Sequence, residues 1–234
     1  EVVMRTADGS IDGKGNIIGD ATADYREPGE MYTPRKRKGD TRTPEPRLRN
    51  QGRIFKGKEY LTVFSGMTGE ALQSIDYIPQ RNELRGWGDN RANRSDRFLA
   101  CIAYLDGIHP SVVMCRGYYT RTVLAAFNWD GKNLTNSWTF DTNEPGNENF
   151  AGQGNHNLRV ADIDGDGCDE IVYGSMTVDH NGKGLYSTGM GHGDALHLTQ
   201  FDPSNPRLQI WACHENKKDG STFRDAATGK VIFQ

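Results

Sequence analysis

The sequence predicts an all-β protein made of repeated antiparallel hairpins, and three observations lead to this prediction. Three segments align with one another without gaps, each as a strand, a polar turn and a second strand. Three other segments place a glycine-containing turn between two apolar strands. The 234 residues also include 28 glycines and 9 prolines, which supply the closely spaced turns that many short strands require.

The first kind of hairpin repeats most clearly. In each copy the first strand ends in an aspartate: Asp164 and Asp202 fall in register when the copies are aligned, and Asp106 lies one position later. Because the turn chemistry repeats together with the apolar pattern, we interpret the copies as one structural unit. The copies are CIAYLDGIHPSVVMC from Cys101, VADIDGDGCDEIVYG from Val160 and LTQFDPSNPRLQIWA from Leu198.

A second kind of hairpin accompanies the first. Its copies are Leu61 to Leu72, Leu124 to Phe140 and Phe223 to Phe233. Two hairpins make four strands, which is one blade of a β-propeller. At the usual period of about 40 residues per blade, the chain would hold roughly three to four blades, too few to close a ring comfortably. We therefore expect residues 1–234 to form a partial propeller, with the remaining blades of the same propeller on both sides of this chain.

The segment 27–50 interrupts this pattern with four prolines, a run of basic residues and no apolar periodicity. One interpretation is a solvated insertion. The other is a basic arm that helps to hold an acidic polymer. The basic residues of the segment are Arg35, Lys36, Arg37, Lys38, Arg42, Arg47 and Arg49.

The overall charge and the cysteines exclude several classes of function. A formal net charge of -3 gives no global attraction to nucleic acid or to an anionic membrane, and no apolar run approaches the roughly 18 residues that span a bilayer. The four cysteines form no CxxC pair, which argues against a thiolate metal site. A disulfide between Cys101 and Cys115 is one alternative, but free thiols are favoured because a chain of this size does not need a disulfide for stability.

The sharpest motif is the acidic turn DIDGDGCDE, which runs from Asp162 to Glu170. Carboxylates at alternate positions of a glycine-kinked turn can point at one centre, and calcium accepts six to eight oxygen ligands with uneven geometry. Alternatively, some of these aspartates accept hydrogen bonds from turn amides. We predict calcium binding by Asp162, Asp164, Asp166, Asp169 and Glu170.

A second acidic stretch is less dense. Asp8 and Asp12 precede Asn16, Asp20 and Asp24 in a glycine-rich segment. These residues either bind another cation or form an ordinary series of turns. Both readings stay open, with Asp8 and Asp12 as the candidate ligands.

A third group is dispersed along the chain. It consists of Asn155 with His156, His192 with Asp194, and His214 with Glu215. Each lies at a strand end of consecutive units, where radially arranged blades bring residues together. A single histidine is more often a structural residue than a ligand, but three histidines beside polar partners at similar boundaries favour a shared polar site.

Several strings resemble bacterial rhamnogalacturonan lyases with an eight-bladed β-propeller, and the match extends over nearly the whole chain. The strings are MRTADG from Met4, YLTVF from Tyr60, WGD from Trp87, NRSDRFL from Asn93, RGYY from Arg116, AGQGNHN from Ala151, GKGLYSTGMGHGDA from Gly182 and FRDAATGK from Phe223.

The resemblance implies a secreted, periplasmic or cell-surface bacterial enzyme that depends on calcium and degrades pectin. Its substrate would be the rhamnose-galacturonate backbone of rhamnogalacturonan I. The reaction would be β-elimination: a base removes the acidified proton at C5 of galacturonate, and the bond to the leaving oxygen at C4 breaks.

The resemblance also assigns residues. The calcium site of the family near the substrate cleft falls on His156, His192, Asp194 and Glu215, and the Asp162 to Glu170 turn matches a structural calcium loop. The catalytic Lys, Arg and Tyr of the family lie beyond Gln234, so the catalytic and substrate-binding residues within this chain are unknown. The 27–50 insertion is longer than the corresponding family loop, and the four cysteines have no family role.

Two other functions remain as alternatives. A non-catalytic propeller fragment would use its calcium loops structurally and bind carbohydrate or protein. A glycoside hydrolase would need two carboxylic acids across a glycosidic bond. The choice between internal and terminal cleavage stays open.

Overall fold

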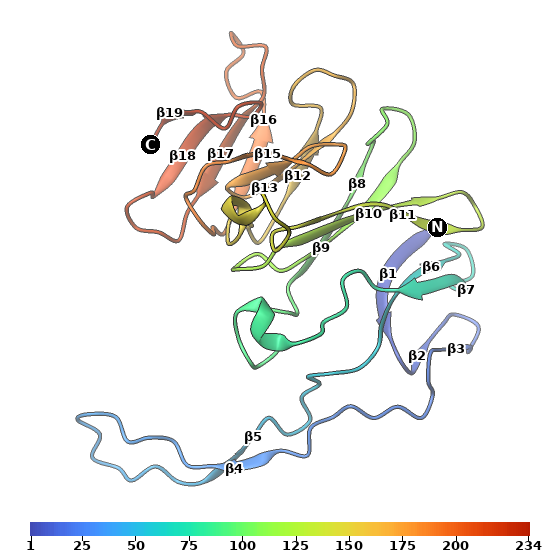
Figure 1. Ribbon diagram of the computed structural model, residues 1–234, viewed down its shortest axis with the longest axis vertical. Helices are drawn as coiled ribbons and strands as arrows, with labels where there is room; N and C mark the ends of the chain where they lie inside the picture. Colours follow the sequence, from blue (N-terminus) through green and yellow to red (C-terminus); the bar gives the residue numbers. More distant parts are fainter. The chain divides into compact units, whose positions relative to one another are not determined.

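The computed structural model describes residues 1–234, and its regular structure consists of β-strands with two short 3₁₀ helices, Leu84–Trp87 and Glu148–Phe150 (Figure 1). The expectation of an all-β fold is confirmed. None of its helices has the length and apolar character needed to cross a membrane. The chain divides into two compact units, residues 1–84 and residues 85–234.

The first unit is built on a three-stranded antiparallel sheet with β6 (Glu59–Phe64) between β1 (Val2–Ala7) and β7 (Ala71–Asp76). Leu61 and Val63 of the central strand are fully buried. A small hairpin, β2 (Ser10–Ile11) with β3 (Ile17–Ile18), follows β1.

The 27–50 insertion forms an antiparallel ribbon, although its sequence shows no apolar periodicity. Strand β4 (Glu30–Tyr32) pairs with β5 (Arg47–Arg49) along the extended loop seen in Figure 1. Most of its residues are exposed and none is buried. Arg49 pairs with Glu30 at 2.7 Å and lies over the Tyr32 ring at 4.5 Å. These side-chain contacts, together with the backbone ladder, replace the apolar face that a buried hairpin would have.

The second unit contains three four-stranded antiparallel sheets whose strands follow the order of the chain. The first holds β8 (Phe98–Ala103), β9 (Ser111–Arg116), β10 (Val123–Trp129) and β11 (Leu134–Asp141). The second holds β12 (Arg159–Ala161), β13 (Glu170–Tyr173), β14 (Met176–Val178) and β15 (Gly184–Ser187). The third holds β16 (Leu196–Thr199), β17 (Gln209–Cys213), β18 (Ser221–Asp225) and β19 (Val231–Phe233).

The hairpins inferred from the repeats are confirmed. The first kind corresponds to β8–β9, β12–β13 and β16–β17, and the second kind to β6–β7, β10–β11 and β18–β19. The aspartates of the three turns also share a role, because each accepts a hydrogen bond from the backbone N–H two residues later. The pairs are Asp106 with Ile108, Asp164 with Asp166, and Asp202 with Ser204, at 2.9 to 3.2 Å.

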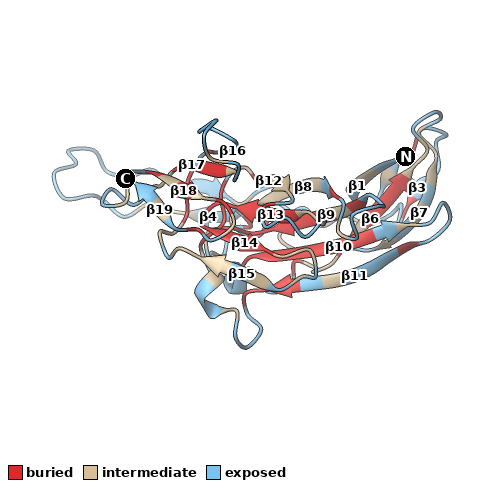
Figure 2. Ribbon diagram, turned by 90° about the horizontal axis from the view of Figure 1, so that it is seen from above, coloured by how far each residue is buried: buried red, intermediate tan, exposed pale blue.

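Consecutive sheets of the second unit share apolar clusters. Leu124 of β10 belongs to the cluster of Ile171 and Tyr173, whereas Val172 belongs to the cluster of Leu196. Strand β13 is therefore buried on both faces because alternate side chains point to opposite sides. Figure 2 shows buried residues concentrated in the central strands. Burying each large apolar side chain stabilises the unit by roughly 1.5–3 kcal/mol.

All four cysteines are free, as favoured from the sequence. Cys101 stands opposite Val113 and Cys115 opposite Leu99, so the two thiols do not face each other in the β8–β9 hairpin. Burial raises the pKa of Cys101 to about 12 and that of Cys115 well above its ordinary value. These two thiols are protonated at neutral pH and act as small apolar side chains.

Candidate functional site

Three loops of the second unit bring together two histidines and two carboxylates. His156 precedes β12, His192 and Asp194 precede β16, and Glu215 follows β17. One ligand atom from each of the four residues lies within 4.8 Å of all the others. The sequence resemblance had grouped these four residues, and the structure places them in one cluster. We call it the histidine centre.

Backbone contacts hold the three loops in contact. Asn155 and Gly193 form an isolated parallel bridge, and the N–H of Glu215 donates to the carbonyl of His192 at 3.0 Å. A Cβ atom at Gly193 would lie 2.1 Å from the carbonyl oxygen of Cys213. Only glycine therefore allows this approach without a backbone shift.

His192 is held in the form that suits a metal ligand. Burial lowers the pKa of His192 below its ordinary value, so the ring is neutral at pH 7. Its Nδ1 lies 2.7 Å from the carbonyl oxygen of Gly154 and donates to it. The lone pair is then on Nε2, which is buried without a hydrogen-bond partner and lies 3.9 Å from Oε1 of Glu215. A backbone carbonyl that fixes the tautomer of a ligating histidine is a common arrangement at metal sites.

His156 is oriented by two tyrosines. Its Nδ1 lies 2.9 Å from the hydroxyl of Tyr118, and its Nε2 lies 3.3 Å from the hydroxyl of Tyr119. The same Nε2 lies 3.7 Å from Oδ1 of Asp194. When Nε2 carries the lone pair, Nδ1–H donates to Tyr118. The Tyr118 ring also stacks on His192 at 5.0 Å, and Tyr119 lies 4.2 Å from the same ring. The tyrosines therefore form an aromatic wall behind both imidazoles.

Two arginines extend this wall. The guanidinium carbon of Arg94 lies 3.5 Å from the centre of the Tyr119 ring, and that of Arg97 lies 5.8 Å from it. Buried N–H groups of both, Nη1 of Arg94 and Nε of Arg97, have no hydrogen-bond partner. Burial of such groups without a partner costs free energy. Cationic N–H groups thus lie beside the histidine centre.

His214 has a structural role. Its Nδ1 lies 3.3 Å from Oγ of Ser175, and its Nε2 lies 2.9 Å from Oγ1 of Thr222. His214 is absent from the group of converging ligand atoms, although its neighbour Glu215 belongs to that group. For this histidine the structural alternative holds.

The acidic turn forms a second cluster. Ligand oxygens of Asp162, Asp164 and Glu170 lie within 4.8 Å of one another. Glu170 is fully buried, and its Oε1 has no hydrogen-bond partner. Burial, with the nearby acidic groups, raises the pKa of Glu170 to about 7. The turn-amide interpretation also holds in part, because Asp162 accepts from the N–H groups of Gly165 and Gly167.

Two residues of the β14–β15 turn join this cluster. Nδ1 of His180 lies 2.9 Å from Oδ1 of Asp179, 3.2 Å from Oδ2 of Asp166 and 3.9 Å from Oε1 of Glu170. His180 Nδ1 and Asp179 Oδ1 are buried and lack a hydrogen-bond partner. Several unsatisfied polar atoms that face one another indicate a position for a cation. We call this group the acidic-loop centre.

Comparison with known proteins identifies the family of this chain. Residues 39–234 match the family described as Rhamnogalacturonan lyase family 11, C-terminal domain. The chain belongs to this family. It is 53% identical over 235 residues to Rhamnogalacturonan exolyase YesX and 52% identical to Rhamnogalacturonan endolyase YesW, both from Bacillus subtilis (strain 168). These matches cover all of this chain but 35% and 34% of the relatives, so the chain spans about a third of their length.

Solved structures of lyases agree with the family 11 assignment. The Bacillus licheniformis Rhamnogalacturonan Lyase PL11 has a TM-score of 0.87 and 55% identity, covering 99% of this chain and 36% of that one. The crystal structure of YesW also has a TM-score of 0.87, at 52% identity. The resemblance drawn from short sequence strings is confirmed at the level of the family.

The structure of this family 11 domain corrects one predicted ligand of the acidic turn. Asp169 points away from the acidic-loop centre, and its Oδ2 accepts from the backbone N–H of Tyr104 at 2.7 Å. The reason is the pleat: Asp169 immediately precedes β13, so its side chain and that of Glu170 leave on opposite sides. Asp169 ties two hairpins together instead.

The possible cation site at Asp8 and Asp12 is not assembled in this domain. Asp8 accepts from the N–H of Asp20 and from the hydroxyls of Tyr25 and Tyr60. Asp12 accepts from three backbone N–H groups and from the side chain of Asn16. The carboxylate oxygens of both residues accept hydrogen bonds from groups of the protein, so ordinary turn chemistry explains this stretch.

Sequence reasoning missed several residues around the two centres: Arg94, Arg97, Tyr118, Tyr119, Asp179 and His180. The strings NRSDRFL and RGYY had contributed only to the family resemblance. The turn Asp179-His180-Asn181-Gly182 carried a usable signal, since a histidine between two polar turn residues resembles the other loops. Its distance from the acidic turn along the chain hid the connection.

Proposed function

We propose that this chain is part of a calcium-dependent rhamnogalacturonan lyase that cleaves the rhamnose-galacturonate backbone of pectin by β-elimination. Membership of family 11 and the names of the similar curated proteins support the substrate class. The observation that most supports the proposed site is the state of His192. Its imidazole is neutral and buried, and its Nε2 lacks a hydrogen-bond partner and lies near the carboxylate of Glu215. We also propose that the protein is bacterial and is exported to the periplasm, the cell surface or the medium, because its proposed substrate is a polymer.

The donors of the histidine centre fit a divalent cation. Two imidazole nitrogens and two carboxylates converge, and the side chains of Asp194 and Glu215 are 66% and 54% exposed. Calcium needs more oxygen ligands than these side chains offer. The exposed side leaves room for water or for oxygens of the substrate, as at catalytic metal sites. The choice of calcium rests on the resemblance, since imidazole ligands by themselves suit several metals.

A bound cation would neutralise the carboxylate of galacturonate and so acidify the proton at C5. Within this chain, His156, His192, Asp194 and Glu215 hold the position. The guanidinium groups of Arg94 and Arg97, which lie over the Tyr119 ring, would add positive charge beside this position. The elimination moves the C5–H electrons into a C4–C5 double bond while the leaving oxygen keeps the C4–O pair. We propose that the base lies outside this chain.

The acidic-loop centre would hold a structural calcium ion. Oxygens of Asp162, Asp164, Asp166, Asp179 and Glu170 provide the ligands that calcium prefers. The ion would connect the β12–β13 turn to the β14–β15 turn and satisfy the buried Oε1 of Glu170. We propose this role because carboxylates of like charge and one histidine face one another where the turns meet.

We also propose that the sheets are blades of a partial eight-bladed propeller. Strand β12 contacts β8 on one side and β16 on the other, as the innermost strands of neighbouring blades would. Trp211 and Phe233 of the last sheet are 42% and 50% exposed and contact each other at 5.5 Å. This aromatic face offers the surface on which a further blade would pack.

The test uses the complete enzyme of which we propose this chain is a part. Formation of unsaturated ends from rhamnogalacturonan would be followed by ultraviolet absorbance, with calcium and with chelator. We expect activity to be lost in chelator and restored by calcium. Asp194→Asn and Glu215→Gln should lower activity by at least tenfold, whereas the exposed control Glu144→Gln should not.

Equal activity of all variants would contradict the role of the histidine centre. Cleavage without a new absorbance would indicate hydrolysis and contradict the lyase chemistry. Calcium binding without any cleavage would favour the non-catalytic carbohydrate-binding alternative.

A further inference from the structure

The charges of this chain are strongly segregated. Residues 26–58 contain 11 basic and 4 acidic residues, a formal charge of +7. The remaining residues therefore carry -10 of the net charge of -3. This segment comprises the β4–β5 ribbon and the stretches that lead into it and out of it, and we call it the basic ribbon.

Most cations of the basic ribbon have no ionic partner. Arg26, Arg49 and Lys58 pair with Asp24, Glu30 and Asp76. Seven others, all Lys or Arg, form no ion pair within the chain: Arg35, Lys36, Arg37, Lys38, Arg42, Arg47 and Lys56. Concentrated charge of one sign raises the free energy of the folded state and attracts ligands of opposite charge.

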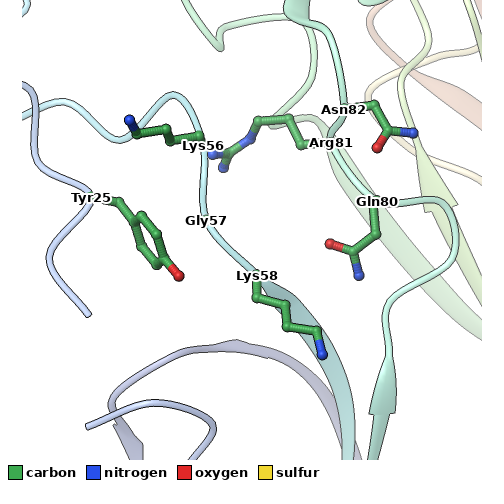
Figure 3. A pocket seen from close by; sticks show the side chains of 7 residues that line it. All are labelled: Tyr25, Lys56, Gly57, Lys58, Gln80, Arg81 and Asn82. Atoms are coloured by element: carbon green, nitrogen blue, oxygen red, sulfur yellow. The ribbon is translucent and has the colours of Figure 1, made fainter. Parts of the chain in front are cut away.

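A cavity of about 430 Å³ lies at the base of the basic ribbon. Figure 3 shows the stretch Lys56–Lys58 running between Tyr25 and the stretch Gln80–Asn82. No acidic side chain lines this cavity. Its volume is in the range of about 300–1,000 Å³ that is typical of small-ligand sites.

The walls of the cavity are held in place by contacts outside it. The Tyr25 hydroxyl donates to Asp8 at 2.8 Å, and its ring packs on Gly57, where a Cβ would lie 2.6 Å from it. Arg81 is buried and donates to the carbonyl of Ile54. The walls are therefore rigid before a ligand binds, which reduces the entropy cost of binding.

One cation of the cavity has no partner to compensate it. Lys58 pairs with Asp76 at 3.1 Å and Arg81 with Glu59 at 3.4 Å. Lys56 is exposed and forms no ion pair. The amide of Asn82, at a φ of 49°, is exposed on the opposite side. A carboxylate that reached Lys56 while a sugar hydroxyl reached Asn82 would match both walls.

We propose that this cavity is a binding subsite for a uronate residue and that the basic ribbon binds further carboxylates of the same polymer. The inference rests on the proposed function for the identity of the polymer, but it uses residues of the first unit only. A nucleic acid fits less well because single strands bind through stacking on open aromatic faces. Arg49 covers Tyr32, and Tyr25 packs against Gly57.

The experiment measures binding of galacturonate oligosaccharides to the 234-residue chain by titration calorimetry in the presence of chelator. Chelator removes any contribution of cations at the two centres, so failure of the lyase proposal would not change the result. We expect Lys56→Gln to weaken binding about threefold or more. The control Lys132→Gln removes an exposed lysine from the β10–β11 turn and should leave binding unchanged.

A second variant separates the ribbon from the cavity. Changing Arg35, Lys36, Arg37 and Lys38 together to Gln should weaken the binding of long galacturonate chains but not of the galacturonate dimer. Added salt should weaken the binding of the long chains and of the dimer. Thermal melts confirm that each variant is folded. Equal affinity of Lys56→Gln and Lys132→Gln, equal binding of neutral galactan, or stronger binding of a single-stranded oligonucleotide would overturn the proposal.

Discussion

At the scale of single residues, Glu170 is a buried carboxylate that a bound cation would stabilise. The side chain is fully buried, and one oxygen accepts from the backbone N–H of Ile163. The other oxygen faces His180 and has no hydrogen-bond partner. A cation would satisfy this oxygen, whereas without a cation the charged form is disfavoured.

The raised pKa of Glu170 predicts a pH dependence with a definite sign. The pKa is about 7 in the folded chain against 4.5 for the ordinary group. The folded state without calcium therefore binds a proton more tightly than the unfolded state between these values. Stability contributed by protonated Glu170 is present below about pH 4.5 and lost as the pH rises through about 7.

Glu170→Gln tests this relation in both directions. Without calcium at pH 8, the variant should be more stable than the parent chain by roughly 2–3 kcal/mol, because no buried charge remains. With calcium it should be less stable, because a ligand is lost. Thermal melts with calcium and with chelator measure both effects. A change of the same sign in both buffers would contradict the assignment of Glu170 as a ligand.

Tyr118 predicts an effect through His156. Tyr118→Phe removes the hydroxyl that lies 2.9 Å from Nδ1 of His156 while it keeps the ring that stacks on His192. We expect calcium affinity at the histidine centre to fall about tenfold, as on loss of a partner that orients a metal ligand. Tyr104→Phe, at an exposed tyrosine, serves as the control. Equal calcium affinities of the two variants would show that the hydroxyl does not orient His156.

At the scale of elements, the strands were predictable and the ribbon was not. Alternation and repeated turns define the hairpins because side chains of a strand alternate between its faces. The burial of strand β13 on both faces was not predicted, because the strand begins with the charged residue Glu170. The β4–β5 ribbon gives no such signal, since backbone pairing and contacts such as that of Arg49 with Tyr32 form it.

The site was predictable only in part, for a similar reason. Residues at the strand ends of consecutive units could be grouped because equivalent strand ends were expected to meet on one face. Direction of a side chain could not be read from spacing: Asp169 leaves the cluster that its neighbour Glu170 enters. His180 joins the acidic-loop centre from the β14–β15 turn. The position of this turn beside the centre depends on the pairing of β13 with β14. The density of acidic residues alone could not distinguish a cation ligand from a turn residue such as Asp12, whose carboxylate accepts hydrogen bonds from turn N–H groups.

Gly193 tests how the loops of these elements meet. Gly193→Ala would place a Cβ 2.1 Å from the backbone oxygen of Cys213, so the backbone must shift. We expect a loss of stability of about 1–3 kcal/mol and weaker calcium binding at the histidine centre. Gly86→Ala is the matched control, because nothing lies within 4 Å of a Cβ there. Denaturant unfolding and calcium titration of both variants give the comparison, and a wild-type affinity in Gly193→Ala would contradict this packing argument.

At the scale of the whole molecule, the chain has a cluster of residues that could hold a cation and a basic surface, but no assigned catalytic base. It spans about a third of the length of the curated relatives it matches. We therefore predict that the 234-residue chain, folded and loaded with calcium, forms no unsaturated product from rhamnogalacturonan. Absorbance assays at matched concentrations of the chain and of the complete enzyme measure this. Efficient product formation by the chain alone would place the base among its own residues.

The most direct test of the central claim is a crystal structure of the protein grown with calcium. We predict a strong density peak among Nε2 of His192, His156, Asp194 and Glu215, with carboxylate oxygens at about 2.3–2.6 Å from it. A second peak should lie among Asp162, Asp164 and Glu170. Occupancy of the second position with only water at the first would contradict the claim that the histidine centre is a calcium site.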